Sequence, residues 1–183
     1  MKRPLVLLLA GIGLMVAASL ASGFGPAYNA TPSIAKGFYW KLPVASTHEF
    51  ARGDLACHHW SSPRWAAGRP GYPPDGIALC KRVALLAGDP IEVAHNGDAA
   101  SLKVPDWAWP TAVRQQDSRG RALPDALSGL GTVPAGHLVL MGEHPHSLDD
   151  RYLGPTRRAD VSSRLVPLWT WGGVEPLNTR EIR

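Results

Sequence analysis

The sequence is poor in the features that mark specialised protein classes. Its net charge is only +4, and its charged residues, 19% of the chain, form no long run of one sign. So modest and scattered a charge argues against a nucleic-acid partner. The chain also has no internal repeat and no low-complexity tract. Its 45% hydrophobic content is that of an ordinary globular chain, with one domain as the default expectation.

Cysteine is equally scarce, because Cys57 and Cys80 are the only two in the chain. A structural zinc site needs close ligand pairs such as C-x-x-C, and none occurs. The histidines that would otherwise join a metal site are therefore interpreted as solvated loop residues: His58, His59, His144 and His146.

Charge is absent altogether from residues 5–24, LVLLLAGIGLMVAASLASGF, and about 20 such residues span a bilayer. Lys2 and Arg3 precede this run, which predicts a cytoplasmic N-terminus and an exported remainder. A signal peptide cleaved at the small residues ending at Ala21 is the alternative, but the length of the run favours a retained anchor over residues 1–25. Because disulfides persist in oxidising compartments, we predict that Cys57 and Cys80 are bridged.

Proline and glycine, 17 and 19 in the whole chain, separate short apolar stretches and predict a β-rich exported part. Strands are expected over residues 37–43, 54–59, 77–86, 90–96, 137–142 and 165–171. Residues 60–76 and 98–132 are expected to be loops beside the sheet, the second with a short helix in DSRGRALPDALSGLG, residues 117–131.

The segment CKRVALLAGD, residues 80–89, leads a lysine into an apolar run. A free lysine is almost fully protonated at neutral pH, but burial lowers a lysine pKa by up to about 3 to 5 units. A strand position near Val83 and Leu85 supplies that burial, so Lys81 is a candidate neutral base. Arg82 stays charged at any working pH and is expected to point to the opposite face of the strand.

A neutral lysine can activate a serine hydroxyl, in place of the histidine of better-known triads. The turn-forming stretch NATPSIAKGFYW, residues 29–40, offers Ser33, which follows the apolar run by about nine residues. At no more than about 3.6 Å per residue, Ser33 lies within about 32 Å of the bilayer surface. The catalytic edge is therefore expected to face the membrane.

Four blocks occur in order behind the N-terminal anchor: NATPSIAKGFYWKLP, RGDLACHH, CKRVALLAGD and GEHPHSLDDRYLGP. From about Asn29 to Leu168 the chain resembles the type I signal peptidase superfamily, and more closely its conjugative-transfer branch, the TraF-like proteases that mature pilin subunits. The resemblance implies a mostly-β fold of coiled antiparallel sheets with a smaller inserted lobe, at about residues 98–132, behind one membrane-anchor helix.

Carried over by position, the resemblance makes Ser33 the nucleophile and Lys81 the general base, and gives the Ser33 backbone N–H to the oxyanion hole. The supporting residues it implies are Thr31 for the oxyanion hole, Ser147 to orient the lysine, and Asp149 with Arg151 as an ion pair. The chain departs from the family pattern at Ala35, at Ala87, in GEHPH and at Asp150. We expect Asp150 to point outward, because a buried carboxylate would keep Lys81 charged.

The resemblance further implies an endopeptidase domain, residues 26–183, on the periplasmic side of the bacterial inner membrane, held by a single-pass anchor. Its partners would be membrane lipid and a precursor pilin or other signal-peptide-bearing protein, cleaved after small residues, with no metal or organic cofactor required. Some TraF-like enzymes also join the new carboxyl end of the pilin to its own amino terminus. The alternatives are a general leader peptidase and an inactive structural component of a transfer apparatus.

Overall fold

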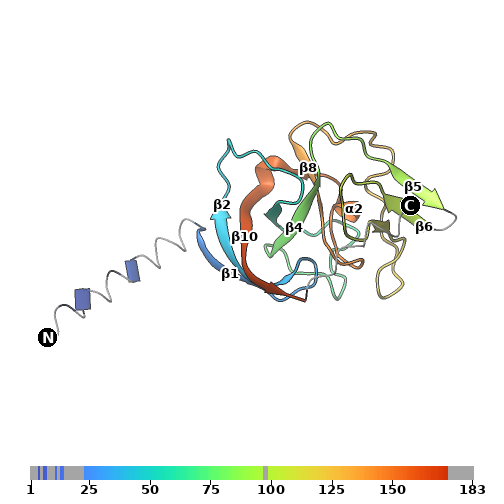
Figure 1. Cartoon of the computed structure of the whole chain (residues 1–183). Helices are drawn as coiled ribbons and strands as arrows, with labels where there is room; N and C mark the ends of the chain where they lie inside the picture. The colour runs from blue at the N-terminus through green and yellow to red at the C-terminus, as the bar shows by residue number, and fades with distance from the viewer. Residues whose placement is uncertain are drawn as a thin grey trace.

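The computed structural model of the chain describes residues 23–96 and 99–172, together with six positions between residues 4 and 14 (Figure 1). Most of the expected anchor, residues 1–25, lies outside this described part. No helix within the described part is long and apolar enough to cross a membrane.

An antiparallel sheet of seven strands in the order β1-β2-β10-β3-β4-β8-β9 forms the body of the molecule, and a second sheet has the order β5-β6-β7. The main sheet contains β1 (Gly25–Asn29), β2 (Lys36–Pro43), β3 (Leu55–His59), β4 (Ala78–Leu85), β8 (His137–Met141), β9 (Thr156–Arg157) and β10 (Val161–Trp171). The second contains β5 (Val93–Asn96), β6 (Ala99–Leu102) and β7 (Ala112–Val113). A short helix, α2 (Asp150–Leu153), and a 3₁₀ turn (Arg158–Asp160) lie between β8 and β10.

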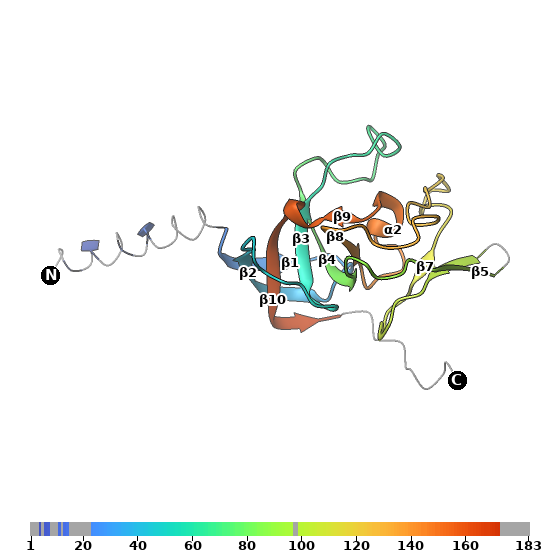
Figure 2. The same cartoon turned by 90° about the horizontal axis from the view of Figure 1, so that it is seen from above.

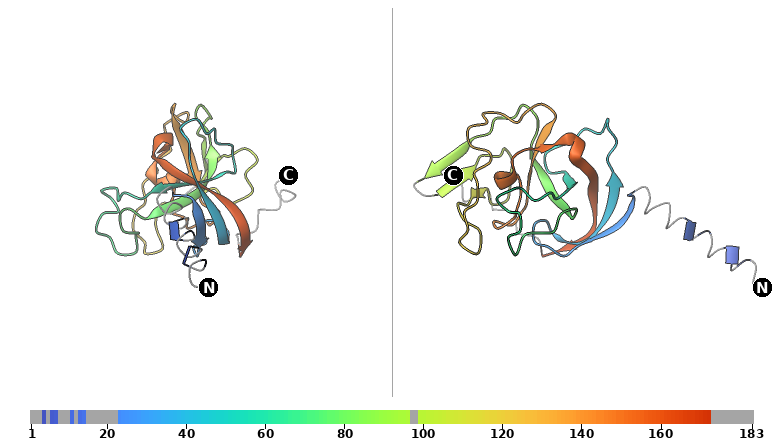
Figure 3. Two further views of the ribbon diagram at one scale, coloured as in Figure 1. Left: turned by 90° about the vertical axis from the view of Figure 1, so that its left-hand side faces the viewer. Right: turned by 180° about the vertical axis from the view of Figure 1, so that it is seen from behind.

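The long strand β10 connects two parts of the main sheet, because it pairs with β2 on one side and with β3 on the other. Its register shifts between Pro167 and Trp169, where the proline has no N–H for the ladder, so the strand bends there. Gly37 of β2 permits the close approach, since a Cβ on this residue would lie 2.2 Å from the Trp169 carbonyl oxygen. Figure 3 shows β1, β2 and β10 as a curved layer at one end of the molecule.

The second sheet lies at the opposite end of the molecule from β1 (Figure 1). It is attached through a buried cluster in which Leu102 and Val113 join Leu85 and Met141 of the main sheet. The connection between β3 and β4 projects from the body of the sheet, as Figure 2 shows.

All six expected strands are present, with ends that differ by a few residues. The sequence reading missed β1, β6, β7 and β9, which are short or follow polar residues. The prediction of a short helix within residues 117–131 was wrong, because the structure has turns there. Asp117 accepts hydrogen bonds from the backbone N–H groups of Arg119 and Arg121. Asp125 likewise accepts one from the Ser128 N–H. Such local bonds between side chain and backbone compete with the hydrogen bonds of a helix.

Cys57 and Cys80 form a disulfide between directly paired residues of β3 and β4, with their Cα atoms 4.0 Å apart. The bond joins neighbouring strands at the position next to Lys81. It also closes a loop over a sequence separation of 23 residues, which removes chain entropy from the unfolded state.

The double substitution Cys57→Ala/Cys80→Ala should lower the free energy of unfolding by about 2 to 4 kcal/mol, because the unfolded chain regains that freedom. For a domain of this size the melting temperature should fall by roughly 5–15 °C, as measured by thermal unfolding followed by circular dichroism. A reducing agent should lower the melting temperature of the wild-type chain and leave that of the double variant unchanged. Equal melting temperatures for the two proteins would contradict the expectation.

Candidate active site

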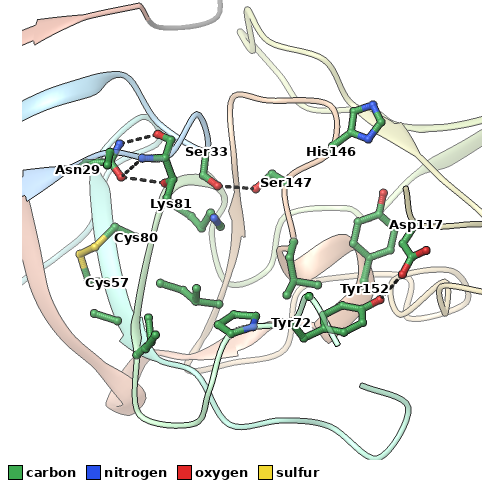
Figure 4. Close-up of a pocket in the computed structure, with 18 of the residues that line it drawn as sticks. Asn29, Ser33, Cys57, Tyr72, Cys80, Lys81, Asp117, His146, Ser147 and Tyr152 are labelled. Atoms are coloured by element: carbon green, nitrogen blue, oxygen red, sulfur yellow. Dashed lines mark hydrogen bonds between the residues drawn. A yellow bond between two sulfur atoms is a disulfide. The ribbon is translucent and has the colours of Figure 1, made fainter. Parts of the chain in front are cut away.

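A cavity of about 770 Å³ opens between the main sheet and the segments that carry Tyr72, Arg114 and Ser147. Ser33, Lys81 and Ser147 all contribute to its lining. In Figure 4 the Lys81 amine points toward the space beside the hydroxyls of Ser33 and Ser147. Three residues that lie far apart in the sequence are thus brought to one cleft.

The turn between β1 and β2 holds Ser33, and the side chain of Asn29 organises that turn. The Asn29 amide nitrogen donates to the carbonyl oxygens of Thr31, Ile34 and Ala35 at 2.8, 3.1 and 3.1 Å. The Asn29 amide oxygen accepts from the Thr31 hydroxyl at 2.8 Å and from its backbone N–H at 3.2 Å. Sequence reasoning missed this role, although an asparagine directly before a turn is the signal for such bonding.

The hydroxyls of Ser33 and Ser147 are 3.5 Å apart, and a short segment after β8 fixes both residues. The Glu143 backbone N–H donates to the Ser33 carbonyl oxygen at 2.7 Å. Ser147 packs directly on Gly142, where an added Cβ would lie 2.0 Å from the Ser147 hydroxyl oxygen. The distance between the two hydroxyls therefore depends on a glycine at position 142.

Lys81 of β4 is 3% exposed, which makes it one of the few buried charged residues of the fold. Burial lowers the pKa of its amine to about 8, from 10.5. Asp149 and Asp150 oppose this shift in pKa and Arg151 adds to it. In the part of the chain that the structure describes, the Lys81 amine makes no hydrogen bond. When the amine is neutral, its lone pair is therefore available to accept a proton.

Asp149 and Arg151 form a fully buried ion pair behind the cleft. The Arg151 guanidinium donates to both carboxylate oxygens of Asp149 at 2.8 Å and also to the Ala112 carbonyl oxygen at 2.7 Å. The second carboxylate oxygen of Asp149 accepts the Gly142 N–H at 2.9 Å. The pair therefore links the second sheet, through Ala112, to the segment that positions Ser33 and Ser147.

Asp150 is buried, so the expectation that it points outward was wrong. Residues 150–153 form helix α2 with Asp149 as its N-cap, and the alternation of an extended segment does not apply. The Asp150 carboxyl accepts from the Leu140 N–H at 2.7 Å and from the Thr156 hydroxyl at 2.9 Å. Burial raises the pKa of Asp150 to about 8, although the hydrogen bonds that its carboxyl accepts from Leu140 and Thr156 lower it.

Arg82 and Glu143 form a second supporting pair that the sequence reading missed. Arg82 does not line the cleft, but its guanidinium lies 2.7 Å from the carboxylate of the buried Glu143, whose N–H holds Ser33. The same guanidinium donates to the Gly53 carbonyl oxygen at 2.8 Å and stacks on the ring of Trp109, 4.6 Å from its centroid. The signal was the acidic residue in GEHPH, two residues after β8.

Thr31, His144 and His146 are the remaining residues that the sequence singled out. Thr31 lines the cleft, and its hydroxyl donates to Asn29, so it has to rotate before it can serve an oxyanion. His146 lines the cleft one residue before Ser147, while His144 is outside the cavity lining. Within residues 23–96 and 99–172, no cluster of three His, Cys, Asp or Glu side chains is arranged to hold a metal ion.

A serine in a rigid turn, a second hydroxyl beside it and a buried lysine of lowered pKa are the groups that acyl transfer through a serine ester requires. The chain belongs to the signal peptidase family, peptidase S26, whose sequence profile matches residues 3–170. It is also similar to two proteins of Escherichia coli described as "Plasmid transfer protein TraF". One is 28% identical over 174 residues, which cover 89% of this chain and 93% of the relative. The other is 30% identical over 171 residues, which cover 90% of each.

The lowered pKa of Lys81 can be measured directly. In protein with ¹³C-labelled lysines, one amine should titrate near pH 8, and its signal should be absent from the Lys81→Met variant. Since only the unprotonated amine accepts a proton, peptidase activity should rise with pH. The neutral fraction is about 1% at pH 6, about 10% at pH 7 and about 50% at pH 8. A Lys81 signal that titrates near 10.5, or activity that is flat between pH 6 and 8, would contradict a neutral base.

Gly142→Ala should disturb the site more than the fold, because its Cβ would overlap the Ser147 side chain. A displacement of about 1 Å at a reacting group lowers rates by about 10²-fold. Peptide cleavage by the variant should fall by that order, while thermal unfolding shows whether the domain remains folded. Wild-type cleavage by a folded Gly142→Ala protein would show that the position of Ser147 is unimportant.

Proposed function

We propose that the chain is a membrane-anchored serine endopeptidase in which Ser33 is the nucleophile and Lys81 the general base. The observation that carries this proposal is the buried Lys81 amine, of pKa about 8, in the same cleft as Ser33. Membership of the signal peptidase family supports it, and implies a substrate that carries a signal sequence.

In the proposed reaction, neutral Lys81 takes the proton of the Ser33 hydroxyl as the serine oxygen attacks the peptide carbonyl carbon. The Ser33 backbone N–H is suited to bind the oxyanion, since it donates to no other group in the described part of the chain. The protonated lysine then gives its proton to the leaving amine. Water, or an amine of the product itself, releases the acyl group and restores the free serine. Ser147, 3.5 Å from Ser33, would keep the lysine and the nucleophile aligned.

The substrate we propose is a precursor pilin of a conjugative transfer system. The two relatives named as plasmid transfer proteins support this choice, since the chain is similar to them over almost its whole length. A general leader peptidase is the alternative within the same chemistry. Depleting the protein should block pilus assembly and leave bulk secretion intact if the enzyme is dedicated to pilin.

The location we propose is the periplasmic face of the bacterial inner membrane, with residues 1–25 as a single-pass anchor. An exposed aromatic cluster supports this orientation, because its rings neighbour one another on β1, β2 and β10: Tyr28, Phe38 and Trp171, with Trp169 beside them. Aromatic rings of this kind favour the interface between lipid and water. Since Tyr28 and Phe38 lie on the two strands that flank the Ser33 turn, the cleft would receive substrates at the membrane surface.

Ser33→Ala and Lys81→Met should each reduce processing of the precursor pilin by about 10³-fold or more, because each removes a group that acts in the same chemical step. Methionine suits position 81, since it fills the buried space without a charge. Lys103→Met is the matched control, because this lysine is exposed, lies outside the cleft lining and pairs with Glu92, just before β5. Processing is measured by mass spectrometry of pilin from cells that make each variant.

Normal processing by both Ser33→Ala and Lys81→Met would reject the peptidase and favour an inactive structural component of the transfer apparatus. The mass of the mature pilin answers a further question. A product lighter by one water than the linear form indicates that the acyl-enzyme was captured by the pilin's own amino terminus, and the linear mass indicates hydrolysis.

A further inference from the structure

Arg114 is a cleft residue whose charge is not balanced by a carboxylate. It directly follows β7, lines the cavity and is half-buried. One terminal nitrogen of its guanidinium lies against the His146 imidazole, 2.6 Å from Nε2. None of the ion pairs within residues 23–96 and 99–172 includes Arg114. A guanidinium has five donors in a planar fork, and this contact uses only one nitrogen.

The backbone around Arg114 is held firmly to the catalytic segment. The Arg114 N–H donates to the Tyr152 hydroxyl at 3.1 Å, and the carbonyl oxygen of Ala112 accepts from Arg151 at 2.7 Å. His146 immediately precedes Ser147, whose hydroxyl is 3.5 Å from that of Ser33. Because an extended peptide advances about 3.3 Å per residue, a group bound at Arg114 would lie within a few residues of the scissile bond.

The other charges of the cleft leave this region positive. Among the residues of the lining, the cations are Lys41, Lys81, Arg114 and Arg121, and the only acidic residue is Asp117. Asp117 is already engaged, since it accepts from Arg121 at 2.6 Å and from the Tyr72 hydroxyl at 3.0 Å, a contact drawn in Figure 4. A ligand that brings its own negative charge would therefore be favoured over a neutral one.

We propose that Arg114 and His146 form a subsite that binds a carboxylate of the peptide substrate close to the scissile bond. The proposal rests on the peptidase function proposed above and specifies its substrate class. The carboxylate is either an Asp or Glu side chain or the free C-terminus of a short tail beyond the cleaved bond. In both cases the remaining guanidinium donors pair with the two carboxylate oxygens, and the contact with the His146 imidazole fixes the side chain of Arg114.

The test measures binding separately from cleavage, using the full-length Ser33→Ala protein in detergent micelles. The probes are four fluorescein-labelled ten-residue peptides of alanine and glycine, with one Glu or one Gln and with a free or an amidated C-terminus. Fluorescence anisotropy should show that the preferred carboxylate peptide binds about tenfold more tightly than the Gln amide, as expected for one charge-assisted contact. The preference should weaken as the salt concentration rises.

Adding Arg114→Gln should abolish this preference, and Arg114→Lys should retain part of it, because lysine keeps the charge and loses the fork. Arg64→Gln is the matched control, since Arg64 is exposed and outside the cleft lining. Thermal unfolding verifies that each variant is folded.

The four peptides separate the two sources of the carboxylate. A preference that follows the Glu residue assigns the subsite to an acidic side chain, and one that follows the free C-terminus assigns it to a terminal carboxylate. Equal binding of the four peptides, no binding of any, or a preference that survives Arg114→Gln would overturn the proposal. If the preference is present but the wild-type chain cleaves no peptide, the peptidase function fails and the subsite stands.

Discussion

The buried ion pair between Asp149 and Arg151 is the interaction on which the rest of the site depends. Arg151 reaches the Ala112 carbonyl oxygen of the second sheet, and Asp149 holds the Gly142 N–H in the segment that fixes both cleft serines. A fully buried pair of charges is stable only when its remaining donors and acceptors are satisfied, and here the backbone satisfies them. Removing either partner would leave an uncompensated charge in the core and break the link from Arg151 to Ala112 of the second sheet.

The same pair determines how the lysine can work. Two carboxyl groups lie near Lys81, and if both were ionised they would hold its proton in place. The charge of Asp149 is balanced by Arg151, and burial raises the pKa of Asp150 to about 8. Desolvation of the amine therefore outweighs the attraction of its neighbours. From the sequence, a buried Asp150 was expected to oppose the base. In the structure its carboxyl accepts hydrogen bonds from the backbone N–H groups of Leu140 and Thr156.

The cleft that contains Ser33 and Lys81 has two chemically different ends. Toward β1 and β2 it is lined by small and apolar groups such as Ala27, Tyr39 and the disulfide, and toward Arg114 it is polar and positive. The first environment suits small side chains and the second suits a carboxylate. Because the polar wall is attached through Ala112 and Tyr152 to Arg151 and helix α2, the proposed substrate selection and the proposed chemical step share one frame.

Much of the fold follows from the sequence alone, since apolar runs between proline and glycine predict strands wherever local preference and burial agree. The order of blocks around Ser33, Lys81 and Ser147 likewise identifies the signal peptidase family. The turns at residues 117–131 escaped prediction because aspartates there bond to nearby N–H groups, which a helical pattern does not reveal. Only the tertiary structure decided that Asp150 is buried, that Glu143 supports Ser33 and that Arg114 faces the cleft without a carboxylate. Burial, charge balance and distance depend on residues that are remote in sequence, and local pattern carries no information about them.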